Sequence, residues 1–177
     1  MHKSRKAQVW VSVVIYTLIG ITAIGLLLAA FQPRIKELRD STTIKQTVEA
    51  LHTFDTALRS TLIAPGNKRQ IAFKLSEGQL LISPELNTIT WEMKSEKKYS
   101  EPNITIREGP ILVLTEQGNP WKVTLTLNYS GIANITFDGL GNDKILPRAS
   151  NPYSLSVSNL GKAPSHLLQQ VDISLRK

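Results

Sequence analysis

Cysteine is absent from the 177 residues of this chain. The absence excludes disulfide bridges, thiol nucleophiles and metal sites that are built from thiolates. The fold must therefore be held together by an apolar core, and a domain of about 110 residues is long enough to bury one.

The motifs of common enzymes are missing as well. The sequence has no GxSxG, HExxH, Walker or dinucleotide-binding pattern. Its three histidines, His2, His52 and His166, are far apart in the chain. His52 and Asp55 fall on one face of a predicted helix, where we expect an exposed cap or an exposed ion pair instead of a catalytic site. We therefore expect no catalytic activity and no cofactor.

Charge is missing from a long stretch near the N-terminus. No charged residue lies between Lys6 and Arg34, and residues 9–31 are mostly apolar. As a helix this run would extend over roughly 35 Å, which is enough to cross a hydrocarbon core of about 30 Å. A buried helix of a soluble protein rarely stays uncharged for so long, and the apolar part of a cleavable secretory signal is shorter. The run therefore predicts a single transmembrane helix in contact with membrane lipid.

Positive charge is concentrated before this helix. The formal net charge is +7, and Lys3, Arg5 and Lys6 contribute to it before any acid appears. Such charges keep an N-terminus in the cytoplasm under the positive-inside rule. We therefore expect the chain to cross the cell membrane once, with its C-terminal domain outside the cytoplasm, and we expect no nucleic-acid partner.

The helix is expected to continue beyond the membrane. In residues 34–64, apolar residues recur at spacings of three and four from Ile44 onward, which indicates one face of an amphipathic helix. Pro33 should kink the helix near the membrane surface, because proline removes a backbone hydrogen bond. Pro65-Gly66-Asn67 should end it. The apolar positions are Ile35, Leu38, Ile44, Val48, Leu51, Phe54, Leu58 and Leu62.

Residues 65–177 have a different pattern, in which apolar and polar residues alternate with a period of two. This period is typical of strands that bury one face, and the short turns between them favour antiparallel pairing. A loop is expected over residues 139–152. The sequence thus predicts an α+β fold, in which the amphipathic helix packs on an antiparallel β-sheet or sandwich. The expected strands include residues 71–75, 80–82, 89–93, 104–106, 111–114, 121–129, 135–137, 154–157 and 171–175.

The N-terminal segment RKAQVWVSVVIYTLIG resembles the class III signal peptide of type IV pilins, and above all that of archaeal pilins and pilin-like proteins. In that family a short basic leader precedes the apolar helix, and a prepilin peptidase cuts between them. The matching junction here is Lys6-Ala7 followed by Gln8. The resemblance implies a leader of residues 1–7, a mature chain that begins with a transmembrane and stalk helix over residues 8–33, and an extracytoplasmic head.

The resemblance also implies partners. They are the prepilin peptidase and other pilin subunits, which assemble through the apolar helices into a surface filament or pseudopilus. Many pilins carry an acid five places into the mature chain, where this sequence has Ser12. Serine cannot supply a counter-charge to a buried amine, so the departure argues against an abundant, self-polymerising major pilin and leaves a minor pilin or a pilin-like component open.

Small residues in the apolar run are candidates for helix packing. Gly25 and Ala29 lie four residues apart on one face, and Gly20 adds a second position of small volume. Small residues allow close approach of membrane helices, although such pairs are common in membrane helices of every kind.

Three Asn-x-Ser/Thr sequences are candidate glycosylation sites: Asn103, Asn128 and Asn134. Each asparagine is expected on the outward face of its strand, next to an inward Ile104, Leu127 or Ile135. Glycans need such a face, but polar residues on the polar side of a strand are expected in any case.

One loop has the oxygen-rich composition of a calcium site. Asp138, Asn142 and Asp143 lie among glycines and could provide carboxylate and carbonyl oxygens. An ordinary turn has the same composition. A cluster of Lys94, Lys97 and Lys98 is interleaved with acids and is interpreted as a solvated face.

A second hypothesis for the whole chain is a single-pass protein with an uncleaved signal anchor. Its extracytoplasmic β-domain would bind a ligand or partner. The two hypotheses differ in the mature N-terminus, which would be Gln8 in the first and Met1 in the second.

Overall fold

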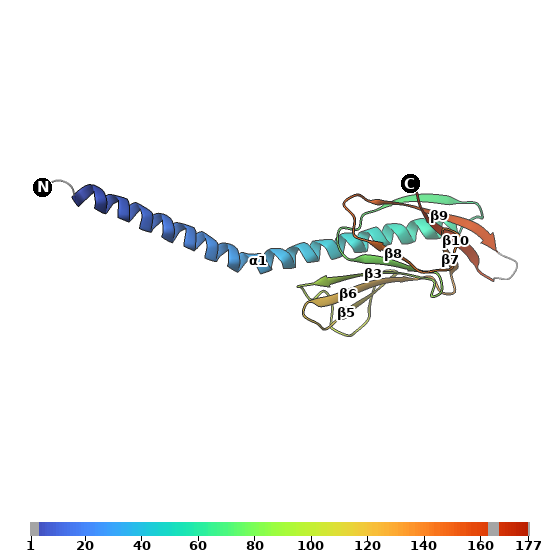
Figure 1. Cartoon of the computed structure of the whole chain (residues 1–177). Helices are drawn as coiled ribbons and strands as arrows, with labels where there is room; N and C mark the ends of the chain where they lie inside the picture. The colour runs from blue at the N-terminus through green and yellow to red at the C-terminus, as the bar shows by residue number, and fades with distance from the viewer. Residues whose placement is uncertain (1–3, 163–166, 177) are drawn as a thin grey trace. The chain divides into compact units, whose positions relative to one another are not determined.

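The computed structural model describes the backbone of residues 4–162 and 167–176, and side chains from Trp10 onward within these ranges (Figure 1). The chain divides after Leu38 into two units, an N-terminal helical unit and a compact C-terminal unit. One helix, α1, runs from Ser4 to Thr61 and contributes to both.

The predicted single helix is therefore confirmed, with ends a few residues from the expected 8 and 64. Pro33 lies within α1, and the helix continues on both sides of it. The predicted kink at this position stays a prediction.

The N-terminal unit has the properties of a membrane anchor. Its helix is long and apolar enough to cross a membrane, and no side chain of the apolar run from Trp10 onward is buried within the chain. An apolar surface of this length is unfavourable in water and favourable in lipid. The segment is therefore a candidate membrane span, as predicted.

In the C-terminal unit, α1 is amphipathic from Ile44 onward. Ile44, Val48, Leu51, Phe54 and Leu58 are all buried. These residues recur every three or four positions and form one face of the helix. The predicted face is confirmed for this part of α1, whereas Ile35 and Leu38, which belong to the N-terminal unit, are exposed.

Within the described residues, ten strands follow the helix and form two sheets. The order in the four-stranded sheet is β1-β9-β10-β7, and in the six-stranded sheet it is β4-β5-β6-β3-β2-β8. The strands are β1 (Lys68–Phe73), β2 (Gln79–Ser83), β3 (Thr88–Ser95), β4 (Ile106–Glu108), β5 (Ile111–Glu116), β6 (Trp121–Asn128), β7 (Ala133–Phe137), β8 (Lys144–Pro147), β9 (Tyr153–Lys162) and β10 (Gln169–Leu175).

Among the strands named above, pairing is antiparallel except between β7 and β10, which are parallel. Parallel neighbours need a long connection, and β8 and β9 provide it between these two strands. In the C-terminal unit, α1 runs between the two sheets (Figure 1), and its buried residues join the inward faces of both sheets in one core. The α+β fold with a helix packed in a sandwich-like head is thus confirmed.

Two details of the strand prediction are wrong. The expected loop over residues 139–152 contains β8, which pairs with β2. Ile104 was expected to point inward, but it precedes the three-residue edge strand β4 and is 54% exposed. An edge strand has a neighbour on one side only, so alternation at its end does not guarantee burial.

Candidate functional site

Two threonine hydroxyls in the apolar part of α1 are bonded within the helix. The hydroxyls of Thr17 and Thr22 donate hydrogen bonds to the carbonyl oxygens of Val13 and Leu18, each at 2.8 Å. Such bonds within one helix remove the penalty for placing a hydroxyl in lipid. This segment can therefore lie in a bilayer without a protein partner for these hydroxyls.

Gly20, Gly25 and Ala29, the predicted helix-packing residues, lie on the exposed surface of this helix. A methyl group placed on Gly20 or Gly25 would have no atom of the described chain within 4 Å. Ala29 is exposed in the same way. The chain itself thus gives these small residues no packing role, and any role must come from lipid or from another molecule.

The predicted cleavage junction lies at the beginning of α1. The helix starts at Ser4, so the backbone of Lys6, Ala7 and Gln8 is helical. Their side chains lie outside the described part of the structure.

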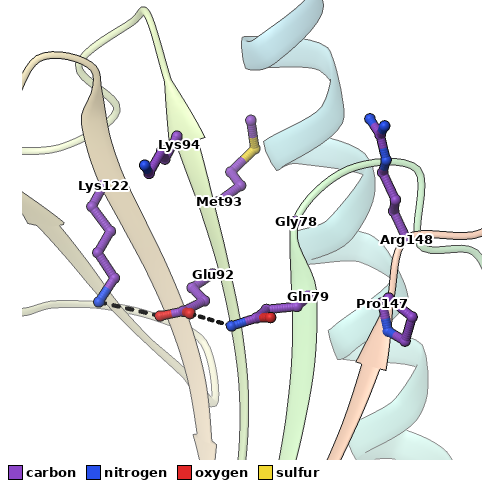
Figure 2. A pocket seen from close by; sticks show the side chains of 8 residues that line it. All are labelled: Gly78, Gln79, Glu92, Met93, Lys94, Lys122, Pro147 and Arg148. Carbon is purple, nitrogen blue, oxygen red and sulfur yellow. Dashed lines mark hydrogen bonds and ion pairs between the residues drawn. The ribbon is translucent and has the colours of Figure 1, made fainter.

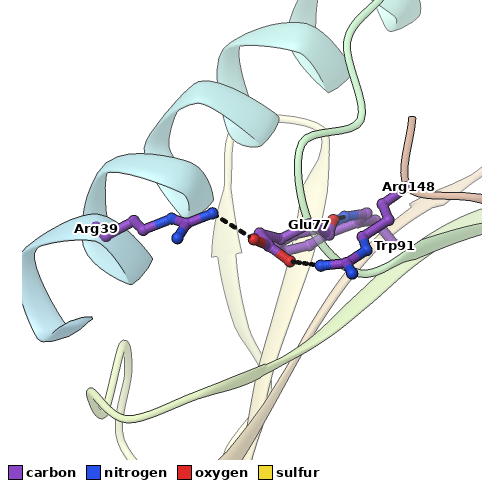
Figure 3. A network of polar contacts seen from close by, with 4 residues as sticks. All are labelled: Arg39, Glu77, Trp91 and Arg148. Carbon is purple, nitrogen blue, oxygen red and sulfur yellow. Dashed lines mark hydrogen bonds and ion pairs between the residues drawn. The ribbon is translucent and has the colours of Figure 1, made fainter. Parts of the chain in front are cut away.

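Where α1 enters the head, it is fixed to the loop between β1 and β2 by Glu77 (Figure 3). Arg39 Nη2 lies 2.7 Å from Glu77 Oε1, and Arg148 Nη1 lies 3.1 Å from Glu77 Oε2. The indole Nε1 of Trp91, which is fully buried, donates to the carbonyl oxygen of Glu77 at 3.0 Å. One carboxylate thus joins the helix, the β1–β2 loop and the segment after β8.

The C-terminal end of α1 is fixed by a buried amide. Asn159 of β9 is 1% exposed, and its Nδ2 donates to the carbonyl oxygens of Thr61 at 2.9 Å and Ala64 at 3.1 Å. These bonds satisfy carbonyl groups that the end of a helix leaves without partners.

A cavity of about 400 Å³ lies on the six-stranded sheet (Figure 2). Its origin is a difference in strand length. Gln79, at the start of β2, is paired with Glu92 of β3 and with Pro147 at the end of β8. Beyond this point β3 and β6 continue side by side to the pair Ser95 and Trp121. The cavity occupies the step where β2 and β8 end. Its lining comprises Gly78, Gln79, Glu92, Met93, Lys94, Lys122, Pro147 and Arg148.

A charged row crosses the cavity. Gln79 Nε2 donates to Glu92 Oε1 at 2.6 Å, and Lys122 Nζ lies 3.2 Å from Glu92 Oε2 and 3.3 Å from Glu116 Oε2. The hydrogen bond from Gln79, supported by Lys122, lowers the pKa of Glu92 below its usual value. The bonds to Glu92 and Glu116 raise the pKa of Lys122. Glu92 is therefore an ionised acceptor and Lys122 a cation at neutral pH.

Lys94 also lines the cavity but differs from Lys122 in having no carboxylate partner among the described residues. It lies directly opposite Lys122 on the neighbouring strand, and like charges in such a position repel each other. Among the residues that the structure describes, no ion pair involves Lys94. The sequence prediction grouped Lys94 with Lys97 and Lys98, whereas the structure groups it with Lys122 and Arg148 at the cavity.

The three candidate glycosylation residues differ in their surroundings. Asn103 is exposed, but it lies in a loop with a φ of 59° instead of on a strand. Asn128 is exposed at the end of β6, and Asn134 is half-buried in β7 opposite Gln170. The inward neighbours Leu127 and Ile135 are buried as predicted. Attachment of glycans stays a prediction.

The candidate calcium loop forms turns around its three oxygen-bearing residues, all exposed. Asp138 has a φ of 50°, and Asp143 Oδ1 accepts a hydrogen bond from Ser83 at 2.7 Å. In the described part of the chain, no group of three His, Cys, Asp or Glu side chains could hold a metal ion.

His52 and Asp55 have separate environments. The His52 ring packs against Gly109, where an added methyl group would lie 2.5 Å from the ring. Asp55 is buried and pairs with Arg59 at 2.8 Å. The expectation of an exposed ion pair is therefore wrong for Asp55, which is buried and pairs with Arg59, one helical turn further along.

Comparisons with known proteins found no matching family model, no similar curated protein and no similar solved structure.

Proposed function

We propose that this chain is a membrane-anchored subunit of a type IV pilus-like surface filament or pseudopilus, and that it assembles through its N-terminal apolar helix. The observation that carries the proposal is the exposed apolar helix that continues, without a break, into the core of a β-rich head. The residues at its start resemble a class III signal peptide.

A filament subunit needs an apolar helix that is stable both in lipid and among copies of itself. The segment from Trp10 to Phe31 meets this requirement, because it carries no charge and its two threonine hydroxyls are bonded within the helix. Gly20, Gly25 and Ala29 leave room for a neighbouring helix. In this proposal the N-terminus is cytoplasmic, the head is extracytoplasmic, and the prepilin peptidase removes residues 1–7.

The alternative proposal is an uncleaved signal anchor with a ligand-binding head. It is favoured by the cavity next to Lys94 and Arg148, because a purely structural head does not require one. In both proposals the chain has no catalytic activity.

Mass spectrometry of the protein from its own membrane tests the first proposal. We expect a mature N-terminus at Gln8, and we expect the longer form to accumulate when the prepilin peptidase is inactivated. A matched pair of variants sharpens the test: Ala7→Trp should block cleavage at the junction, whereas Ala30→Trp, at the far end of the apolar run, should leave cleavage intact. Retention of Met1 in cells with an active peptidase would favour the anchor.

A further inference from the structure

We propose that the cavity beside β2 and β8 is a binding site for an acidic sugar, a ring that carries a carboxylate together with free hydroxyl groups. This inference concerns the head alone and holds for a filament subunit and for a signal anchor alike.

The size of the cavity fits such a ligand. Small-molecule sites enclose roughly 300–1,000 Å³, and the cavity measures about 400 Å³. It is formed by the backbone, because β2 and β8 end while β3 and β6 continue. The site is therefore present without a ligand.

The charges at the cavity favour an anionic group next to Lys94. Three cations line it, Lys94, Lys122 and Arg148, against the single carboxylate of Glu92. Lys122 is already held by two glutamates and Arg148 by Glu77. Lys94 has no such partner among the described residues, and it lies opposite a second lysine. An anionic group next to Lys94 would relieve this repulsion.

The same cavity favours a hydroxyl donor next to Glu92. Glu92 is held as a carboxylate between Gln79 and Lys122, and a carboxylate can only accept hydrogen bonds. An anion placed beside Glu92 would be repelled, whereas a hydroxyl group can donate to it. The amide of Gln79 adds a further polar partner. Charge and hydroxyls must therefore belong to different parts of one ligand.

The remaining lining is apolar. Pro147 lines the cavity, whereas Met93 lies beside it with its side chain in the core, and Gly78 adds backbone without a side chain. Figure 2 shows Lys94 and Lys122 on one side of the cavity and Pro147 and Arg148 on the other. A sugar ring has C–H groups that pack on such a surface, which an inorganic anion lacks. The combination of cation, acceptor and apolar contact therefore selects an acidic sugar.

The test uses the full chain in detergent micelles and titrates it with sodium D-glucuronate, D-glucose and inorganic phosphate, monitored by ligand-observed NMR. We expect glucuronate to bind more tightly than the other two compounds. Lys94→Gln should weaken glucuronate binding by about tenfold or more, because it removes a charge-assisted contact to the carboxylate. Lys68→Gln, which removes an exposed lysine from β1 in the other sheet, should leave binding unchanged.

Several outcomes would overturn the proposal. They are the absence of glucuronate binding, equal binding of glucuronate and glucose, and an equal loss in the two lysine variants. Binding of phosphate as strong as that of glucuronate would mean an anion site that does not recognise the sugar. The thermal midpoint of Lys94→Gln should be no lower than that of the unchanged protein, because the substitution removes a like-charge pair. This control separates a lost contact from a lost fold.

Discussion

Phe54 offers the most direct test of the idea that α1 is a core element of the head. Its side chain is fully buried on the part of α1 that runs between the two sheets. Phe54→Ala would remove the ring and leave a cavity lined by residues of the same core cluster. The perturbation therefore acts on the packing of the helix against both sheets.

The expected loss is large compared with the stability of a single domain. Truncation of a buried phenylalanine to alanine costs about 3–5 kcal/mol, whereas domains unfold with roughly 5–15 kcal/mol in total. The measurement is urea unfolding of the full chain in micelles, followed by circular dichroism. Thr53→Ala is the matched control, because Thr53 is exposed and its hydroxyl donates to the Glu49 carbonyl oxygen of the same helix. We expect its effect to stay within about 0.5 kcal/mol.

A loss below about 1 kcal/mol for Phe54→Ala, or an equal loss in the control, would refute the reasoning. Such a result would mean that the sheets form a stable core without the helix. A changed dependence on urea concentration would instead indicate that the unfolded or native state has altered in compactness.

Three further predictions concern polar groups of the head. Asn159→Ala should lower the free energy of unfolding by about 1–3 kcal/mol, because the carbonyl oxygen of Thr61 then remains buried without its donor; urea unfolding measures the loss, and an unchanged midpoint would contradict it. The folded-state pKa of Glu92 is lowered, so its contribution to stability is present above its unfolded pKa of about 4.3 and is lost as the pH falls through the folded value. The midpoint temperature of thermal unfolding should therefore fall less steeply between neutral and acidic pH for Glu92→Gln than for the unchanged protein. Parallel curves for the two proteins would argue against a lowered pKa of Glu92. Burial and the neighbouring carboxylate of Glu108 raise the pKa of Tyr99 to about 12, so ultraviolet titration should contain a late tyrosinate step that disappears in Tyr99→Phe.

The sequence allowed the main elements of the fold to be predicted, because their patterns are local. The uncharged run and the three-and-four spacing from Ile44 to Leu58 identified α1 and its buried face. The alternation in residues 121–129 identified β6. These signals depend only on which residues face the core.

The missed features depend on neighbours that are distant in the chain. β8 has only four residues between turn-forming segments, so its own pattern is too short to distinguish it from a loop. Its identity as a strand comes from pairing with β2.

The cavity was missed for the same reason. It arises where β2 and β8 end beside longer strands, and it brings together Lys94, Lys122 and Arg148. The lysines become neighbours only through the register of β3 and β6. Their sequence context alone indicated a solvated surface, and a basic cluster became a candidate site only when the strand register was known.

The continuity of α1 has a mechanical consequence. Residues 44–58 belong to the same helix as the apolar run and are enclosed by the head. Each of these buried side chains would have to leave the core if residues 44–58 were pulled out of the head, whereas a flexible tether has no such contacts. Withdrawal of the helix from the head would therefore require rupture of the core of the folded domain.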